Sequence, residues 1–141
     1  MLFRSILCFG GTGQVSVSAN GGTLPYTGTG TFTVVSGISN YTVTDANGCS
    51  SSTSINVPQP TQVVASSAVA SAIPCFGGNG SIIVTAIGGT PGYTGTGNYT
   101  VTAGTYTYTV TDAHGCANNT TTTITQPPAL QPTATITNPI L

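Results

Sequence analysis

The sequence CFGGTG at residues 8–13 returns as CFGGNG at residues 75–80, an offset of 67 positions (75 − 8). Two longer stretches recur at the same offset: GGTLPYTGTG (21–30) as GGTPGYTGTG (88–97), and YTVTDANGC (41–49) as YTVTDAHGC (108–116). About half of the positions in 8–60 are identical to those in 75–127, with no insertion or deletion. Such internal repetition is typical of arrays of one structural unit, so the sequence predicts two copies with a period of 67 residues.

The repeat predicts how the chain is divided. The expected segments are a first unit at 1–60 with a preceding linker at 1–7, a second unit at 61–127, and a linker or first strand of a following unit at 128–141. Proline-rich sequences, PQP at 58–60 and QPP at 126–128, close the two units and stiffen the junctions. We expect two periods of a longer, rod-like array, and the alternative is a complete two-domain protein with short tails.

The apolar pattern within each unit predicts strands. Val15, Val17 and Ala19 alternate with Ser16 and Ser18, which is the period of two expected for a half-buried strand. Similar short segments lie between Gly, Pro and Asn residues at 31–35, 52–57, 82–86, 98–102, 106–110 and 120–125. No segment has helical apolar spacing. We therefore predict an all-β fold of tandem immunoglobulin-like antiparallel β-sandwich repeats.

The four cysteines lie in pairs with equal spacing. Cys8 and Cys49 are 41 positions apart (49 − 8), and so are Cys75 and Cys116 (116 − 75). A unit this small has a marginal core, and a bridge closing such a loop contributes about 4 kcal/mol. We predict one disulfide inside each unit, Cys8–Cys49 and Cys75–Cys116, in an oxidising extracellular compartment. A zinc site is disfavoured because no two cysteines are close in sequence, and no metal or cofactor is expected.

The charge content restricts the partners. Only 2% of the residues are charged, and a single Arg with no Lys leaves a net charge of −1. No basic patch is available for nucleic acid or anionic lipid, and no apolar run reaches the ~18–20 residues of a membrane-spanning helix. We expect no nucleic-acid binding and no membrane insertion. The surface should consist of Thr, Ser, Asn and Gly.

Few residues are suited to catalysis. One His and two carboxylates cannot supply paired acid and base groups in both units, so we predict that the chain is not an enzyme and has no catalytic residue. Asp45 and Asp112 lie in DANG and DAHG sequences that resemble calcium loops, but one carboxylate is far short of a calcium ligand set. The interpretation we prefer is a tight turn in which Gly48 or Gly115 has a positive φ.

Aromatic side chains are the candidates for ligand contact. A polysaccharide-binding surface requires aromatic rings beyond those that fill the core, and the candidates are Tyr26, Tyr93, Phe32 and Tyr99. Packing in the core is the alternative role for each. Hydroxyl-rich strands also suit glycosylation, although no particular acceptor is indicated.

The order CFGG, GGTPGY (88–93), GTYTYTVTDAHGC (104–116) and ITQP (124–127) resembles the SprB repeat, which is found in many copies in large surface adhesins of gliding and other Bacteroidetes. The resemblance covers nearly the whole chain. It implies an extracellular, cell-surface repeat protein that is exported by type IX secretion and takes part in adhesion or gliding motility.

These observations lead to one functional prediction and one alternative. We predict a non-enzymatic repeat segment of an extracellular adhesin or filament that provides reach, stiffness and surface attachment. The alternative is a polysaccharide-binding module. The expected partners are other copies of the chain or further repeats, which would meet through neutral Thr- and Ser-rich sheet faces and edges because no Lys protects the edges.

Overall fold

A computed structural model describes residues 2–138 and 140; Met1, Pro139 and Leu141, which belong to the predicted 1–60 and 128–141 segments, lie outside the described residues. The described chain contains strands and no helix, which confirms the all-β prediction. The strands are β1 (Leu2–Arg4), β2 (Gly13–Val17), β3 (Gly30–Val34), β4 (Gly37–Thr44), β5 (Ser50–Val57), β6 (Val64–Ser71), β7 (Gly80–Ile87), β8 (Gly97–Val101), β9 (Gly104–Thr111) and β10 (Ala117–Ile124).

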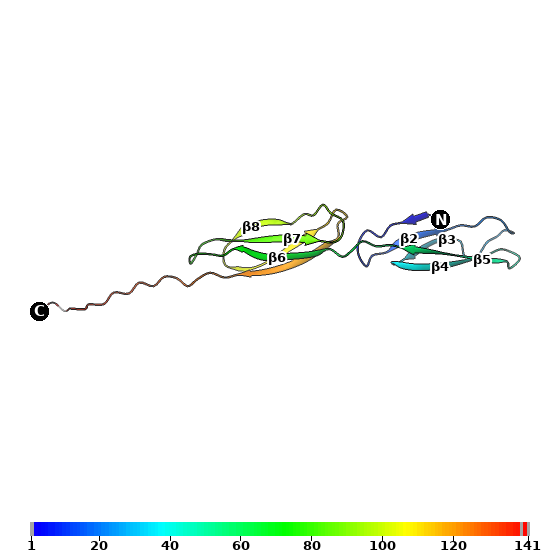
Figure 1. The fold of residues 1–141 in the computed structure, drawn as a ribbon. Helices are drawn as coiled ribbons and strands as arrows, with labels where there is room; N and C mark the ends of the chain where they lie inside the picture. The colour runs from blue at the N-terminus through cyan, green and yellow to red at the C-terminus, as the bar shows by residue number, and fades with distance from the viewer. Residues whose placement is uncertain (1, 139, 141) are drawn as a thin grey trace.

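The strands form four small antiparallel sheets. Their orders are β1-β2-β3, β4-β5, β6-β7-β8 and β9-β10. In Figure 1 the molecule is elongated, and the group formed by β1–β5 and the group formed by β6–β10 lie end to end along its long axis. We call these groups the N-terminal half and the C-terminal half. The segment after β10 extends away from the C-terminal half (Figure 1).

Each half has its own apolar core, to which both of its sheets contribute. Ile6, Val15, Val17, Val34 and Val57 are buried together in the N-terminal half. The C-terminal half buries Ile73, Ile82, Val84, Val110 and Ile124. Because residues of both sheets share one core, the two sheets of each half pack together around it.

The alternating sequence explains which side of each strand is buried. In β7, Ile82 and Val84 are 0% and 1% exposed, whereas Ile83 between them is 39% exposed. Successive side chains of a strand point to opposite faces, so a period of two places every second residue in the core. The same rule buries Val15 and Val17 of β2.

The two halves have corresponding elements in the same chain order. The strands β2, β3, β4 and β5 begin at residues 13, 30, 37 and 50, and β7, β8, β9 and β10 begin at residues 80, 97, 104 and 117. Every pair of starting residues is 67 positions apart. Gly48 and Gly115 both have a φ of 85°, which confirms the predicted positive φ in the two DAxG turns.

We predict that Ile82→Ala lowers the free energy of unfolding of the C-terminal half by about 2–5 kcal/mol, because it leaves a cavity in a fully buried site. Ile83→Ala, on the opposite face of the same strand, is the matched control and should cost less than about 1 kcal/mol. Urea denaturation of the two variants measures the difference. Equal losses would contradict the assignment of the buried face.

Candidate functional site

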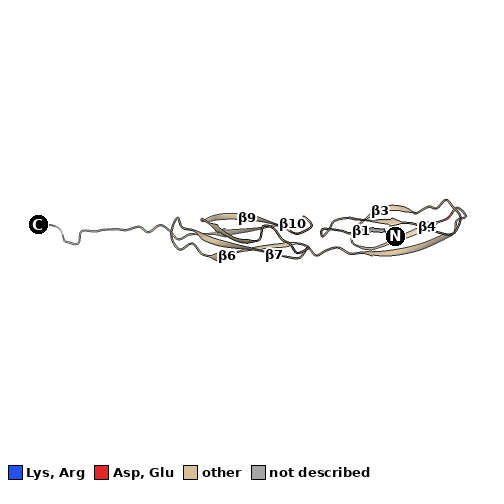
Figure 2. Ribbon diagram, turned by 90° about the horizontal axis from the view of Figure 1, so that it is seen from above, with Lys and Arg blue, Asp and Glu red and all other residues tan. Residues whose placement is uncertain are grey.

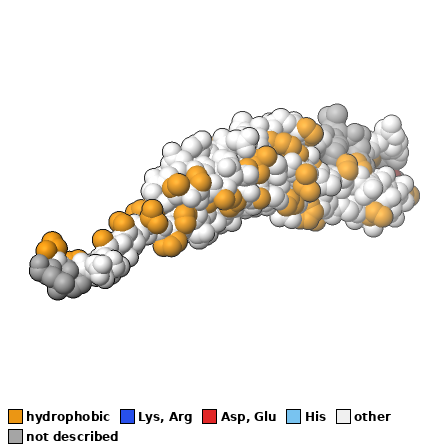
Figure 3. All heavy atoms as spheres, turned by 60° about the vertical axis from the view of Figure 1, so that its left-hand side comes forward, with side chains coloured by type: hydrophobic (Ala, Val, Ile, Leu, Met, Phe, Trp, Pro, Cys, Tyr) orange, Lys and Arg blue, Asp and Glu red, His pale blue; other side chains and the backbone are white. Residues whose placement is uncertain are grey.

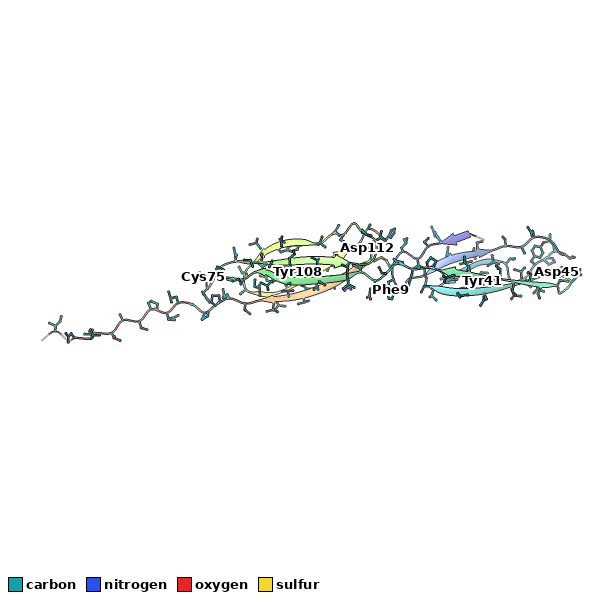
Figure 4. The ribbon with its side chains drawn as sticks, viewed as in Figure 1. Phe9, Tyr41, Asp45, Cys75, Tyr108 and Asp112 are labelled. Carbon is teal, nitrogen blue, oxygen red and sulfur yellow. A yellow bond between two sulfur atoms is a disulfide. The ribbon has the colours of Figure 1, made fainter. Side chains whose placement is uncertain are left out.

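Two repeated loops lie at opposite ends of each half. We call residues 8–11 and 75–78 the head turns, and residues 45–49 and 112–116 the tail loops. A head turn precedes β2 or β7, whereas a tail loop follows β4 or β9. In Figure 4, Phe9 and Asp112 lie where the two halves meet, while Asp45 and Cys75 lie at the far ends of the two halves. The junction therefore brings the head turn of the N-terminal half to the tail loop of the C-terminal half.

A disulfide joins the two halves at this junction. Cys8 of the first head turn is bonded to Cys116 of the second tail loop, with a Cα–Cα distance of 5.6 Å. Cys49 and Cys75 are free and exposed. The predicted pairs Cys8–Cys49 and Cys75–Cys116 are therefore wrong, although a disulfide is present.

The length of the strands explains the correction. Cys8 and Cys49 belong to the same half, but β4 runs between its head end and its tail end. Eight residues of strand span about 26 Å at roughly 3.3 Å per residue, whereas bonded cysteines have Cα atoms within about 7 Å. The same argument separates Cys75 from Cys116. Only cysteines of different halves come together.

Backbone hydrogen bonds and a glutamine hold each head turn. The Gly11 amide donates to the Cys8 carbonyl at 3.0 Å, and the Gly10 amide donates to Oε1 of Gln59 at 2.8 Å. The second head turn repeats both bonds, from Gly78 to Cys75 at 3.0 Å and from Gly77 to Gln126 at 2.7 Å. Each glutamine follows the last strand of its half, so it ties the outgoing chain to the cysteine turn.

An aspartate organises each tail loop. Oδ1 of Asp112 accepts hydrogen bonds from the amides of His114 and Cys116 at 2.9 Å, and Oδ2 accepts one from the Thr90 amide at 2.9 Å. The carboxylate of Asp45 accepts the corresponding hydrogen bonds from the amides of Thr23, Asn47 and Cys49. Each carboxylate therefore fixes the backbone of the cysteine that follows it. This supports the turn interpretation of the two DAxG sequences.

The same hydrogen bonds change the acidity of both aspartates. The Thr90 amide is the main cause that holds the pKa of Asp112 below its usual value of 3.8; the Cys116 and His114 amides add to it, and burial opposes it. The pKa of Asp45 is also lowered, chiefly by the amides of Thr23 and Cys49. Both tail loops therefore carry a carboxylate whose ionised form is preferred in the folded state.

The chain between β5 and β6 also docks at the junction. The Thr61 carbonyl accepts a hydrogen bond from the Gly89 amide at 2.9 Å, and the Val63 carbonyl accepts one from Nδ2 of Asn118 at 2.7 Å. Val63 itself is only 4% exposed. A Cβ on Gly88 would collide with the Gln62 carbonyl oxygen, and one on Gly89 would collide with Val63. Residues 61–63 thus pack closely against the tail end of the C-terminal half.

The tail end of the N-terminal half has a cavity at the corresponding place. It has a volume of about 190 Å³ and lies beside Cys49 and Asp45, between residues 19–22 and 49–51. A Cβ on Gly21 would meet no atom within 4 Å, in contrast to one on Gly88. Gly21 is thus open, whereas its counterpart Gly88 is closely packed against Gln62.

The four aromatic candidates for ligand contact lie at half-buried positions. Phe32 packs on Tyr41 with ring centroids 5.0 Å apart, and Tyr99 packs on Tyr108 at 4.6 Å. The hydroxyls of Tyr26 and Tyr93 donate to the carbonyls of Gly21 and Gly88. The structure does not gather these four rings into one surface.

Burial, with smaller contributions from Tyr106 and Tyr99, raises the pKa of Tyr108.

Sequence reasoning missed the residues that build the junction. Gln59 holds the head turn at the junction, and Asn118 donates a hydrogen bond to the carbonyl of the buried Val63. Phe9 lies beside them and is 53% exposed. The signal for Gln59 was present in the repeated glutamines of PQP and QPP. Val63 had no comparable signal, because its role depends on contact with the other half.

Neither a metal cluster nor a membrane span is found in the described residues. No three His, Cys, Asp or Glu side chains lie together within 2–138 and 140 as a metal site would require. No helix in the same residues is long and apolar enough to cross a bilayer. Comparison of the chain with protein-family models, curated proteins and solved structures finds no match.

We predict that Asp112→Asn lowers the melting temperature at neutral pH and flattens its dependence on acid. A carboxylate with a lowered folded-state pKa stabilises the fold above its usual pKa of 3.8, and this contribution is lost as the pH falls toward the folded-state value. Melting curves between about pH 2 and pH 6 measure both effects. His114→Asn, which copies the residue at position 47 and keeps the carboxylate with its three amide bonds, is the comparison and should keep most of the acid dependence, because the charge of His114 is the smallest cause of the lowered Asp112 pKa. An unchanged acid slope in Asp112→Asn would contradict the role of the carboxylate.

Proposed function

We propose that the chain is a non-enzymatic, load-bearing segment of an extracellular adhesin or surface filament. In this proposal the two halves are tandem immunoglobulin-like β-sandwich repeats with a period of 67 residues, and the boundary between them lies in residues 58–65. The observation that carries the proposal is the Cys8–Cys116 bond, which links neighbouring units rather than stabilising one of them. A cross-link between units contributes stiffness.

Two separate connections at the junction support a stiff rod. One is the backbone of residues 58–63, which is docked through Thr61 and Val63, and the other is the disulfide. A single linker leaves its domains free to bend and twist about it, whereas two connections at different points restrain both motions. The extended outline in Figure 1 is consistent with this role.

The surface and the cross-link together favour an extracellular location. Disulfides persist in oxidising compartments, and they are rare where thiols are kept reduced. Figure 2 shows ribbons that are almost entirely free of charged residues, and Figure 3 shows apolar side chains scattered among neutral polar ones. Such a surface interacts weakly with ions, so the shape of the rod should depend little on salt.

The SprB resemblance supports the narrower part of the proposal, which is a Bacteroidetes adhesin exported by type IX secretion and used in gliding or attachment. A polysaccharide-binding module remains the alternative. No observation in the structure favours that alternative, because the four aromatic candidates are divided among separate half-buried positions.

We predict that the disulfide shields most of the chain from a pulling force. When the chain is stretched from its ends, the load passes through the Cys8–Cys116 bond, so the residues between the two cysteines cannot extend. Reduction should release roughly 370 Å of additional chain, from a separation of 108 residues at ~3.3–3.6 Å each.

Single-molecule force spectroscopy measures this length. Cys116→Ser under oxidising conditions should behave like the reduced chain, and Cys75→Ser is the matched control that should remain shielded. Full extension of the oxidised wild-type chain would contradict the load path.

The proposed location has a separate test. Antibodies raised against the chain should label intact, unpermeabilised cells that produce it, and brief protease treatment from outside should remove the label. Labelling that requires permeabilisation would overturn an extracellular role.

A further inference from the structure

We infer that two copies of this chain join head to tail through a second joint of the same kind as the internal one. In this joint Cys75 of one copy is bonded to Cys49 of the next, and residues 128–134 of the first copy dock on the tail end of the second. The inference rests on the proposed function and adds its partner, a second copy of this chain.

The two free cysteines have the same local structure as the two bonded ones. Cys75 lies in a head turn tied to Gln126, as Cys8 lies in a head turn tied to Gln59. The amide of Cys49 is held by the Asp45 carboxylate, as that of Cys116 is held by Asp112. One end of the molecule therefore carries a free head turn and the other end a free tail loop, and these are the two parts that the disulfide joins at the junction.

Both free cysteines are also available to a partner. Cys49 and Cys75 are exposed, and they lie at opposite ends of the molecule, as the positions of Asp45 and Cys75 in Figure 4 show. They cannot bond to each other within one copy. A head from one copy and a tail from another can meet, and this arrangement repeats without closing on itself.

Leu130 corresponds to the valine that is buried at the internal junction. Residues 128–130 follow Cys75 by the same number of positions (128 − 75) as residues 61–63 follow Cys8 (61 − 8). Val63 is 4% exposed, whereas Leu130 is 94% exposed. The joint would bury an aliphatic side chain that has no apolar cover in the single copy.

The N-terminal half provides a cavity for this leucine. The cavity of about 190 Å³ is lined by Gly21, Gly22, Tyr26, Val43, Asp45 and Cys49, together with residues 19, 20, 50 and 51. At the other tail end, Gly88 and Gly89 directly contact Gln62 and Val63. Leu130 of one copy therefore takes the place beside Gly21 and Gly22 that Val63 takes beside Gly88 and Gly89.

The segment after Leu130 can continue a sheet of the second copy. Residues 64–68 of β6 pair with residues 83–87 of β7, and the positions 67 residues away are 131–135 and 16–20. Among the described residues of the N-terminal half, β1 pairs with residues 14–16 of β2. Position 135 would fall opposite Ser16, which already pairs with Leu2, so residues 131–134 add a strand segment beside 17–20, in line with β1. Pro132 is acceptable there because the added segment lies at a sheet edge.

The covalent step needs an oxidant, for which we name a low-molecular-mass disulfide such as oxidised glutathione. The thiolate of Cys75 attacks this disulfide, which forms a mixed disulfide and releases one reduced thiol. The thiolate of Cys49 from the second copy then attacks the Cys75 sulfur and releases the second reduced thiol. The two cysteines lose two electrons and two protons, which the two released thiols carry.

The first test is incubation of the purified chain with a glutathione redox pair, followed by non-reducing electrophoresis and disulfide mapping by mass spectrometry. We expect a ladder of linked chains whose new bond is Cys49–Cys75 and in which Cys8–Cys116 is retained. A chain that stays monomeric with two free thiols, or a new bond of the Cys49–Cys49 or Cys75–Cys75 type, would overturn the inference.

Two variants show the direction of the joint. On non-reducing electrophoresis, Cys49→Ser and Cys75→Ser should each run as an unlinked single chain when oxidised alone, because each lacks one cysteine of the joint. Mixed together, they should form a dimer and nothing longer, since Cys75 of the first variant meets Cys49 of the second. A dimer formed by either variant alone would show a symmetric contact and contradict the head-to-tail arrangement.

The docked leucine has an independent, noncovalent test. Under reducing conditions, sedimentation should show that Leu130→Ser weakens self-association at least about tenfold. Ile140→Ser changes an equally exposed residue of the same segment and should leave self-association unchanged. Equal behaviour of the two variants would overturn the docking of Leu130. If this joint fails while force shielding and surface labelling hold, only the inference about the second copy is lost.

Discussion

The Cys8–Cys116 bond is the constraint on which the organisation of this protein depends. It connects the head turn of one half to the tail loop of the other, so it fixes a relation between units and leaves each unit to be stabilised by its own small core. A bond inside each half is excluded because the strands carry the two cysteines to opposite ends. Because the bond joins a head turn to a tail loop, the head ends of both halves face the same way along the long axis.

Local hydrogen bonds make this bond geometrically accessible. Asp112 holds the backbone of Cys116 through its amide, and Gln59 holds the turn that contains Cys8. The docked chain around Val63 then brings the two loops together at the junction. A neutral amide side chain, Gln59, and one of the two carboxylates of the chain, Asp112, thus hold the two cysteine loops at the ends of the sheets.

The sequence predicted those structural features that are set by residues close to one another along the chain. Alternation at Val15 and Val17 predicted a strand and its buried face, and the glycine after DAN or DAH predicted a positive φ. Equal spacing of the cysteines was misleading, because spacing does not say at which end of a strand a residue lies. The burial of Val63 could not be predicted at all, since it depends on contact with residues far along the chain.

The most direct test of this organisation is disulfide mapping of the purified monomer by mass spectrometry after proteolysis without reduction. We expect a linked peptide pair containing Cys8 and Cys116, and unlinked peptides containing Cys49 and Cys75. Peptide pairs containing Cys8 with Cys49 and Cys75 with Cys116 would contradict it, because the bonds would then lie within units and the junction would have no covalent bridge.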